Sequence, residues 1–523
     1  MKNAYMYLTW SVIILLFFVC PVVISFVFNW SFKEIPEISI NAYILWNFLH
    51  FGLQALFCIL NYRWINKLEI KEDQKKVGLQ MVGWREDPKL FRAALESIKT
   101  LHGYKQFVFV SDGNEKEDLY LQAEFLSVFQ NAHICSVDGY LYDNPYLWEK
   151  IKKYRYVCVF QKHKGKRHAL YSAFKYFIWS GVDYILTTDS DTVFHPNCLI
   201  ELKKLAEHTN AGACTGMVQI YNIDNFQAFL IAMKYWIAFF IERGAQSYHG
   251  VVSCVAGPLG FYRVKSLENI LEKWLHQEFL GEECTYGDDR HLTNLILSKG
   301  KQIYYTHKAI VWTETPVTLK RWILQQMRWG RSFIRELFLN FAWFHKQHIW
   351  LACDLIFVSL YSIILIVALL LLLFQFKFTN ILYFTYGILI VSLIRGIFGA
   401  WYHMDIRYVY FMFFGVLYVF LLLPVKLWAL CTLKQRGWGT STRKVIKDSG
   451  NISMIPVILW NLIIWGGIIT TIVLDPSEFL EPVNFWLAVG LGSLSLTMAI
   501  IYYIFNKSIL RNTINEHVEI EMV

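Results

Sequence analysis

The sequence predicts an α/β domain with a mostly parallel sheet, inserted between two groups of α-helical membrane segments. Two observations support this fold class. The 523 residues are 55% hydrophobic and 17% charged, with a mean hydropathy of +0.34, which is too apolar for a soluble protein of this length. The apolar runs lie at both ends, whereas residues 62–347 are polar and alternate strand-like with helix-like patterns. This middle stretch is long enough to form one large α/β domain.

Seven apolar runs approach the roughly 20 residues that cross a bilayer core. They are 7–28, 41–61, 349–374, 379–401, 407–432, 453–474 and 484–505. The first run is followed closely by the second, without a small-residue cleavage site between them, so it is interpreted as a membrane helix and not as a signal peptide. The expected division is 1–61 as an N-terminal transmembrane helix pair, 62–347 as the α/β domain with membrane-interfacial helices toward its end, and 348–523 as C-terminal transmembrane and interfacial helices.

The charge distribution predicts the orientation. The net charge is +9, and basic residues gather where the chain should leave the membrane, at Arg63, Lys67 and Lys71 and in the loop Gly437–Lys447. The positive-inside rule places these segments and the central domain in the cytoplasm. An even number of crossings must then separate the domain from the loop, so run 407–432, which contains Pro424 and Lys426, is expected to be re-entrant or interfacial. Six crossings and two cytoplasmic termini follow.

The ten cysteines are scattered singly, and several lie inside apolar runs. They form no CxxC pair and no spacing typical of a disulfide framework. This usage fits a reducing cytosol around the central domain and thiols that are buried and inert.

Polar residues follow three of the predicted strands. Strands are expected at 77–83, 106–110, 155–160 and 183–188, with helices at about 166–180 and 196–207. The strand ends carry Trp84-Arg85-Glu86-Asp87, Ser111-Asp112-Gly113 and Asp189-Ser190-Asp191. Because ligands bind at the carboxyl ends of parallel strands, these residues are candidates for a common site.

Asp189 and Asp191 are the candidate metal ligands. Two carboxylates spaced i, i+2 just after a strand can reach a hard cation that bridges a diphosphate. Such a pair is weak by itself, because strand-to-turn junctions favour Asp, but other residues strengthen it. Asp112, with Gly113 beside it, is a candidate for the nucleoside. A basic cluster around Gly165 can attract an anionic donor; it comprises Lys162, Lys164, Lys166 and Arg167.

A second acidic cluster lies at the predicted helix start Gly287-Asp288-Asp289-Arg290-His291. The plain interpretation of Asp288 is a helix cap. Asp289 is the candidate general base, because a carboxylate held near a bound donor can accept the proton of an attacking hydroxyl group. Further along, Gln325, Gln326, Arg328 and Trp329 precede Arg331 and Arg335. Their plain interpretation is an interfacial basic-aromatic belt.

In this order, and flanked by membrane segments, these motifs resemble the processive inverting glycosyltransferases that include hyaluronan, chitin and cellulose synthases. The resemblance covers nearly the whole chain and is strongest to hyaluronan synthases. It rests on GWREDP at 83–88, SDGN at 111–114, GKR at 165–167, DSDT at 189–192, IERGAQSYHG at 241–250, SCVAGPLGFYR at 253–263, GDDRHLTN at 287–294, ETP at 314–316, QQMRWGRSFIRE at 325–336, WFHKQHIW at 343–350 and GWGTSTRK at 437–444.

The resemblance implies a cytoplasmic GT-A domain in a plasma-membrane enzyme that polymerises GlcNAc and GlcA from UDP-GlcNAc and UDP-GlcA and moves the polymer across the membrane. It places Asp112 and Lys166 on the nucleotide, Mg2+ or Mn2+ on Asp191 and Asp189, and the base at Asp289. The substrate-binding set is completed by residues implied to contact acceptor, pyrophosphate or sugar: Ser253, Cys254, Gly257, Asp288, Gln325, Arg328, Trp329, Arg331 and, on a gating-type loop 437–444, Trp438. The implied partners are the growing polysaccharide and the lipid bilayer, with no nucleic acid and no obligate protein partner.

Some residues depart from the family pattern without removing a group that the mechanism needs. They are Ser111, Thr188, His168 and the pair Gly330-Arg331, where relatives often have Ser-Lys. Arg keeps the charge of Lys but not its geometry, so sugar specificity is the property left open. The alternatives are a chitin or chito-oligosaccharide synthase, a nonenzymatic channel with a vestigial domain, and a lipid-linked single-sugar transferase. Trp236, Trp329 and Trp438 are candidates for stacking on sugar rings.

Overall fold

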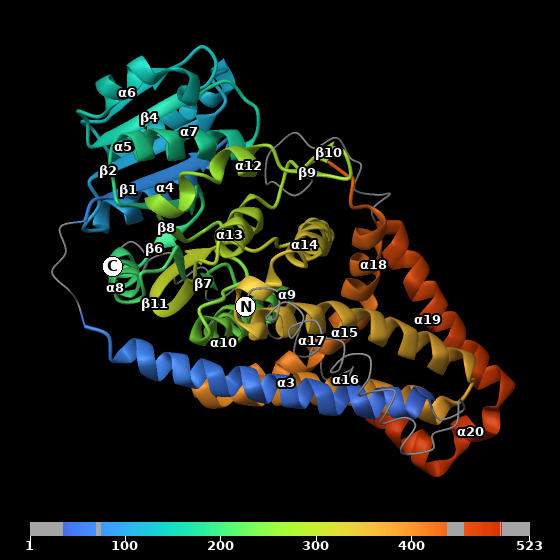
Figure 1. Cartoon of the computed structure of the whole chain (residues 1–523). Coiled ribbons are helices and arrows are strands. Elements are labelled where there is room, and N and C mark those ends of the chain that lie inside the picture. The colour runs from blue at the N-terminus through green and yellow to red at the C-terminus, as the bar shows by residue number, and fades with distance from the viewer. Residues whose placement is uncertain (1–34, 70–74, 437–453, 492, 494–523) are drawn as a thin grey trace.

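The computed structural model describes residues 35–69, 75–436, 454–491 and 493. The α/β domain and a group of long helices lie side by side (Figure 1). The expected run 7–28, most of run 484–505, and the loop that contains Trp438 lie outside the described residues.

A nine-stranded sheet forms the centre of the α/β domain. Its order is β3-β4-β2-β1-β5-β8-β7-β11-β6. Neighbouring strands are parallel except at β8, which runs antiparallel to β5 and β7, and at β6, which is antiparallel to β11. The strands are β1 (Val77–Gly83), β2 (Gln106–Asp112), β3 (His133–Ser136), β4 (Tyr156–Gln161), β5 (Tyr184–Asp189), β6 (Val193–Phe194), β7 (Ala213–Ile220), β8 (Gly260–Arg263) and β11 (Ile303–Thr313). The mostly parallel α/β fold expected from the sequence is confirmed.

The four predicted strands correspond to β1, β2, β4 and β5 within one or two residues at their ends. They are buried because each is a run of apolar, β-favouring residues covered on both faces. Asp112 and Asp189 are the last residues of β2 and β5, which flank β1 on either side. The parallel register therefore brings both carboxylates to the same edge of the sheet.

Helices cover the sheet on both faces (Figure 1). Asp87 caps the first of them, since its side chain accepts hydrogen bonds from two backbone N–H groups and Pro88 follows at the first helical position. The helices of this layer are α4 (Pro88–Thr100), α5 (Tyr120–Val128), α6 (Pro145–Ile151), α7 (Lys166–Trp179), α8 (Cys198–Thr209), α11 (Val264–Leu267), α12 (Leu271–Leu275) and α13 (Asp288–Ser298). Short 3-10 turns at Lys116–Asp118 and Leu141–Asp143 and the hairpin β9 (Glu278–Phe279) and β10 (Glu282–Glu283) complete the domain.

Two helical segments connect this domain to the membrane helices. The first consists of α9 (Phe226–Trp236), a π-helical stretch (Ile237–Glu242) and α10 (Arg243–Tyr248). The second is α14 (Leu319–Asn340), which is followed by a 3-10 turn at Phe344–Lys346. Both lie between the sheet and the long helices (Figure 1).

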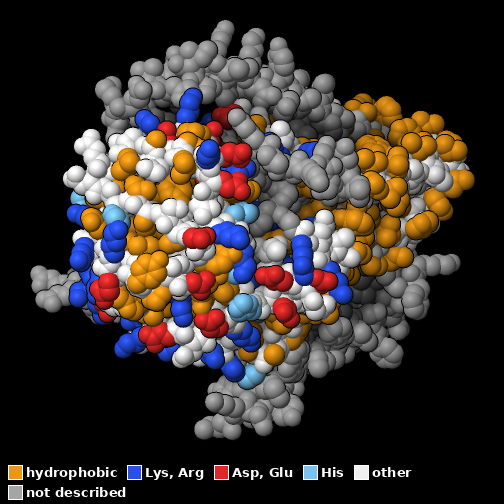
Figure 2. Space-filling view, turned by 90° about the horizontal axis from the view of Figure 1, so that it is seen from above, with side chains coloured by type: hydrophobic (Ala, Val, Ile, Leu, Met, Phe, Trp, Pro, Cys, Tyr) orange, Lys and Arg blue, Asp and Glu red, His pale blue; other side chains and the backbone are white. Residues whose placement is uncertain are grey.

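Among the described residues after the domain, four helices are long and apolar enough to cross a membrane. They are α15 (Ile349–Phe374), α16 (Phe378–His403), the unit Ile406–Cys431 and α19 (Ile455–Leu474). The helices α20 (Pro476–Leu480) and Pro482–Leu491 follow. Figure 2 shows hydrophobic side chains gathered on one side of the molecule, beyond the mixed charges of the α/β domain. The expected membrane character is confirmed.

The unit Ile406–Cys431 is not a regular helix. It consists of a 3-10 turn (Ile406–Phe411), α17 (Met412–Leu417), a π-helical stretch (Tyr418–Leu422) and α18 (Leu423–Cys431). Its length and composition would allow it to cross a membrane, so the six-crossing topology stays a prediction. Before the domain, the expected run 41–61 lies within α3 (Ile35–Asn66), which buries Asn47, Gln54 and Asn61 against the rest of the protein.

Candidate active site

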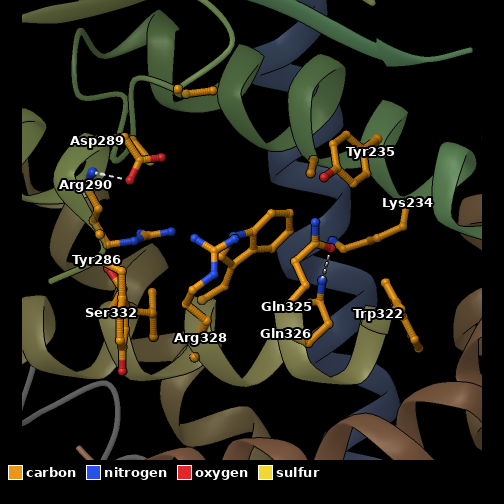
Figure 3. A pocket seen from close by; sticks show the side chains of 18 of the residues that line it. Lys234, Tyr235, Tyr286, Asp289, Arg290, Trp322, Gln325, Gln326, Arg328 and Ser332 are labelled. Carbon is orange, nitrogen blue, oxygen red and sulfur yellow. Dashed lines mark hydrogen bonds between the residues drawn. The ribbon is translucent and has the colours of Figure 1, made fainter. Parts of the chain in front are cut away.

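One continuous cavity joins the strand-end edge of the sheet to the long helices. Its volume is about 1370 Å³. It begins at the strand ends that carry Asp112 and Asp189, passes Asp289, and continues between α3, α15, α16 and α18. Figure 3 shows its middle, where side chains from α9, α13 and α14 approach one another from three sides.

Asp112 lies at the outer end of the cavity and is 2% exposed. Its carboxylate accepts hydrogen bonds from the backbone N–H groups of Lys164 and Gly165 at 3.1 and 2.9 Å, and His163 Nδ1 lies 2.9 Å from Oδ2. His163 stacks on Trp84 with the ring centroids 4.1 Å apart. Asp112 therefore fixes the loop 163–165, which carries Lys164. The stacked rings of His163 and Trp84 line the cavity beside it.

Asp189 and Asp191 lie next to this end of the cavity. Lys166, the first residue of α7, forms an ion pair with Asp189. Burial by itself would lower the pKa of Lys166, but the carboxylates of Asp189, Asp288 and Asp289 outweigh it and raise the pKa above its usual value. Burial, with the nearby charges of Asp189 and Glu86, raises the pKa of Asp191 to about 7. Negative charge is thus concentrated here beyond what one lysine balances.

The two carboxylates fit a divalent cation that a diphosphate also ligates. Asp191 Oδ1 is buried, and no described residue forms a hydrogen bond with it. A cation would satisfy that oxygen and offset the repulsion between the acidic side chains. No three His, Cys, Asp or Glu side chains within the described ranges are grouped so as to hold an ion by themselves. This matches Mg2+-type sites, in which one or two carboxylates and the phosphates of the substrate share the coordination sphere.

Asp289 lies in the first turn of α13 and faces the cavity (Figure 3). Its Oδ1 accepts a hydrogen bond from the Arg290 N–H at 2.7 Å, and Cys254 Sγ donates to Oδ2 at 3.7 Å. Burial and the neighbouring Asp288 raise the pKa of Asp289. A carboxylate with a raised pKa is better matched to accepting a proton near neutral pH.

The alternative interpretation of Asp288 as a helix cap does not hold. Gly287 occupies the N-cap position with φ +86°, and Asp288 is the first residue of the helix. A side chain on Gly287 would collide with Ser332, so a glycine allows α13 to start directly against α14. Asp288 lines the cavity, and its carbonyl accepts a hydrogen bond from Trp274 Nε1 at 2.7 Å.

The loop 253–258 connects the two acidic groups. The Val255 N–H donates to Thr293 Oγ1 at 2.9 Å, which fixes the loop to α13. A Cβ on Gly257 would lie 3.0 Å from Asp189 Oδ2, so the loop approaches this candidate metal ligand as closely as a glycine allows. Ser253, Cys254 and Gly257 all line the cavity, where the sequence predicted the acceptor side.

Four predicted residues of α14 line the cavity: Gln325, Gln326, Arg328 and Trp329. Figure 3 shows Gln325 and Arg328 extending from α14 toward the space that Tyr235 enters from α9 and Asp289 from α13. Burial lowers the pKa of Arg328, although the charges of Asp288 and Asp289 oppose this effect. Trp329 is 38% exposed beside this space, so its ring is available to a ligand.

Two residues named from the sequence do not line the cavity. Arg331, expected at the phosphate, is not among the residues that line the cavity; its Nε donates to Thr432 Oγ1 at 2.9 Å, because it projects from α14 toward α18. Trp236, expected to stack on sugar, is 5% exposed and packs against Phe240 and Tyr402. Trp438 lies outside the described residues.

A path for the polymer through the C-terminal helices was expected, but the residues that line the inner half of the cavity were not predicted. Its wall contains polar side chains from segments of apolar composition, namely Asn47, Gln54, Asp354, Ser362, Arg395 and Lys426. The polar and ionisable residues within the apolar runs could have indicated this path, because such residues in membrane segments face protein interiors or water-filled cavities. Lys426 was noticed, but only as a reason why its segment would not cross the membrane.

Comparisons with known proteins agree with this geometry. Residues 147–332 match the family model described as glycosyltransferase like family 2. Hyaluronan synthase 2 of Xenopus laevis is 37% identical over 466 residues, covering 84% of each chain. Hyaluronan synthase 2 of Homo sapiens is 38% identical over 444 residues, covering 81% of this chain and 80% of the relative. Hyaluronan synthase 3 of Mus musculus is 36% identical over 451 residues, with the same shares covered.

The similarity to a solved structure is weaker. A mannosyltransferase from Pyrobaculum calidifontis in complex with GDP-Man and Mn2+ has a TM-score of 0.41 and 14% identity, covering 76% of this chain and 99% of that one. The curated relatives are similar to this chain over both the α/β domain and the helices that follow it.

Proposed function

This chain belongs to the hyaluronan synthase family of membrane glycosyltransferases, and on that premise we propose that it polymerises GlcNAc and GlcA from UDP-GlcNAc and UDP-GlcA. The cavity carries the proposal, because it joins the acidic strand-end site to the interior of the helix bundle without a break. A polysaccharide is strongly polar, so its path through a membrane must be lined by protein.

The donor occupies the strand-end half of the cavity. Asp112 keeps the loop 163–165 in place, and the Trp84–His163 pair offers an aromatic surface for the nucleoside. Lys166 holds Asp189 and provides a cation near the diphosphate. Arg328 extends into the same space from α14 and can stabilise the negative charge that grows on the leaving UDP.

Asp189 and Asp191 would hold Mg2+ or Mn2+ together with the diphosphate. The cation supplies electrostatic stabilisation of the leaving group. The chain's own part is to place Asp189, which Lys166 and the loop residue Gly257 confine from two sides. The unpartnered oxygen of Asp191 is then available for coordination.

Asp289 is the proposed general base. It accepts the proton of the acceptor hydroxyl as that oxygen attacks the anomeric carbon of the donor from the face opposite UDP. An α-linked donor then gives a β-linked product. The acceptor would lie between Asp289, the loop 253–258 and the ring of Trp329, and it would extend into the inner half of the cavity.

We further propose that the α/β domain faces the cytoplasm, that the protein resides in the plasma membrane and that the polymer leaves through the helix bundle. Basic residues at Arg63, Lys67 and Lys71 support this orientation. UDP-sugars are cytoplasmic metabolites, so the donor end of the cavity would open toward its substrates.

The test is incorporation of labelled sugar by the purified protein in detergent, with Mg2+ or Mn2+. Three reactions are compared: UDP-GlcNAc alone, UDP-GlcA alone, and both donors together. Polymer formed only with both donors and degraded by hyaluronidase supports the proposal. Polymer formed from UDP-GlcNAc alone and degraded by chitinase would replace it with a chitin synthase.

A further inference from the structure

A buried carboxylate connects the long helices to the loop 253–258, which lies on the proposed acceptor side of the site. Asp354, near the start of α15, is 3% exposed. Its Oδ1 lies 2.9 Å from His50 Nε2 and accepts a hydrogen bond from Gln54 Nε2 at 3.1 Å. Its Oδ2 accepts a hydrogen bond from Gln246 Nε2 at 2.7 Å. One side chain therefore joins α3, α10 and α15.

The connection continues to the site. Gln246 Oε1 accepts a hydrogen bond from the Ser253 N–H at 2.9 Å. Ser253 begins the loop whose next residue, Cys254, contacts Asp289. An unbroken series of contacts thus runs from the membrane helices through Asp354 and Gln246 to the acceptor side of the site.

The orientation of the Gln246 amide depends on Asp354. A carboxylate only accepts hydrogen bonds, so it requires the NH2 group of Gln246 on its side. The carbonyl of Gln246 must then face the Ser253 N–H. If the amide turned over, two donors would face each other in a buried place, which is unfavourable.

We propose that Asp354 is a positioning residue for the acceptor: through Gln246 it fixes the loop that begins at Ser253 at the point where the polymer enters the helix bundle. This inference rests on the proposed function. Donor binding should depend little on Asp354, because the donor residues Asp112, Lys166 and Asp191 belong to other elements.

The substitution Asp354→Asn tests the inference. Asparagine offers one acceptor and one donor group where three donors converge, so at least one of the contacts is lost. We expect polymer formation to fall about tenfold, as for loss of a buried hydrogen-bond partner. Donor hydrolysis, measured as UDP release without acceptor, and the KM of each donor should stay within about twofold of the parent.

Gln246→Leu interrupts the same connection at its second member. It should likewise lower polymer formation while leaving donor hydrolysis nearly unchanged. The double variant should be no worse than Gln246→Leu alone, because the effects of two changes in one connection do not add. Asn380→Ala is the matched control: it removes the hydrogen bond from the buried Asn380 side chain to the half-buried Gln375 in the bundle, and Asn380 does not line the cavity.

The outcomes separate this inference from the proposed function. A parent protein that makes no polymer from both donors refutes the proposed function. A parent that polymerises, with an Asp354→Asn variant that does so equally well, refutes only the role of Asp354. Equal losses of hydrolysis and polymer formation, or additive losses in the double variant, also refute it, because they indicate general damage to the fold.

Discussion

Gly257→Ala is expected to weaken metal binding without changing the backbone. The added Cβ would lie 3.0 Å from Asp189 Oδ2, 3.4 Å from Oδ1 and 3.6 Å from Cγ. The first distance is shorter than ordinary van der Waals contact, so the carboxylate must move by a few tenths of an ångström. Such a shift displaces Asp189 from Lys166 and from the place where a cation would bind.

The expected magnitude follows from the role of neighbours around metal ligands. Changes to residues that orient a ligand typically cost about 10- to 100-fold in metal affinity. We expect the Mn2+ or Mg2+ concentration for half-maximal polymerisation to rise by about tenfold, at the lower end of that range because the shift is small. The rate at saturating metal should fall less.

The assay is a metal titration of the initial polymerisation rate at saturating donors. Gly466→Ala is the control, because a Cβ at that position meets no atom within 4 Å. A Gly257→Ala titration that superimposes on the parent curve would refute the reasoning, since it would mean that the Asp189 carboxylate does not hold the metal or relaxes without effect.

Three further substitutions test other parts of the site. Asp289→Asn should lower polymer formation by about 100-fold or more while UDP-sugar binding, measured by calorimetry, is retained; near-normal turnover would exclude Asp289 as the base. Asp112→Asn replaces one of the two carboxylate oxygens that accept backbone N–H hydrogen bonds with a donor group and should raise the donor KM about tenfold, whereas an unchanged KM would exclude its role. Arg331→Ala should leave the donor KM unchanged, because Arg331 does not line the cavity; a large rise in KM would restore its predicted phosphate contact.

The outer half of the site was predictable because strand ends can be recognised from local patterns. Apolar runs ended at Asp112 and Asp189, and the parallel arrangement brought those ends together. The distance of Asp289 from them could not be predicted, because α13 follows much later in the chain and its position depends on tertiary packing. Its candidate role as the base was inferred from the acidic pair and agreed with the resemblance, and the structure adds that its carboxylate is partly buried and faces the cavity.

The positions of Arg331 and Trp236 outside the cavity lining have physical reasons. Arg331 is next to Ser332, which lines the cavity, but its Nε donates to Thr432 Oγ1 just after α18. The sequence does not show which neighbouring element each charged side chain of α14 meets. Trp236 was misplaced because a buried aromatic and a sugar-stacking aromatic have the same sequence signal, and only packing distinguishes them.

The two π-helical stretches in the described part of the chain lie in segments that line the cavity. Phe239 and Glu242 come from the first, and Tyr418 and Leu422 from the second. A π-helical turn inserts an extra residue into the helix and changes which side chains share a face. Residues before and after the turn can then face the same space, as Tyr235 and Gln246 do on either side of the first stretch. Helices whose outer surfaces are apolar can therefore present polar side chains to one interior path. A polar polymer requires such a path to cross a membrane.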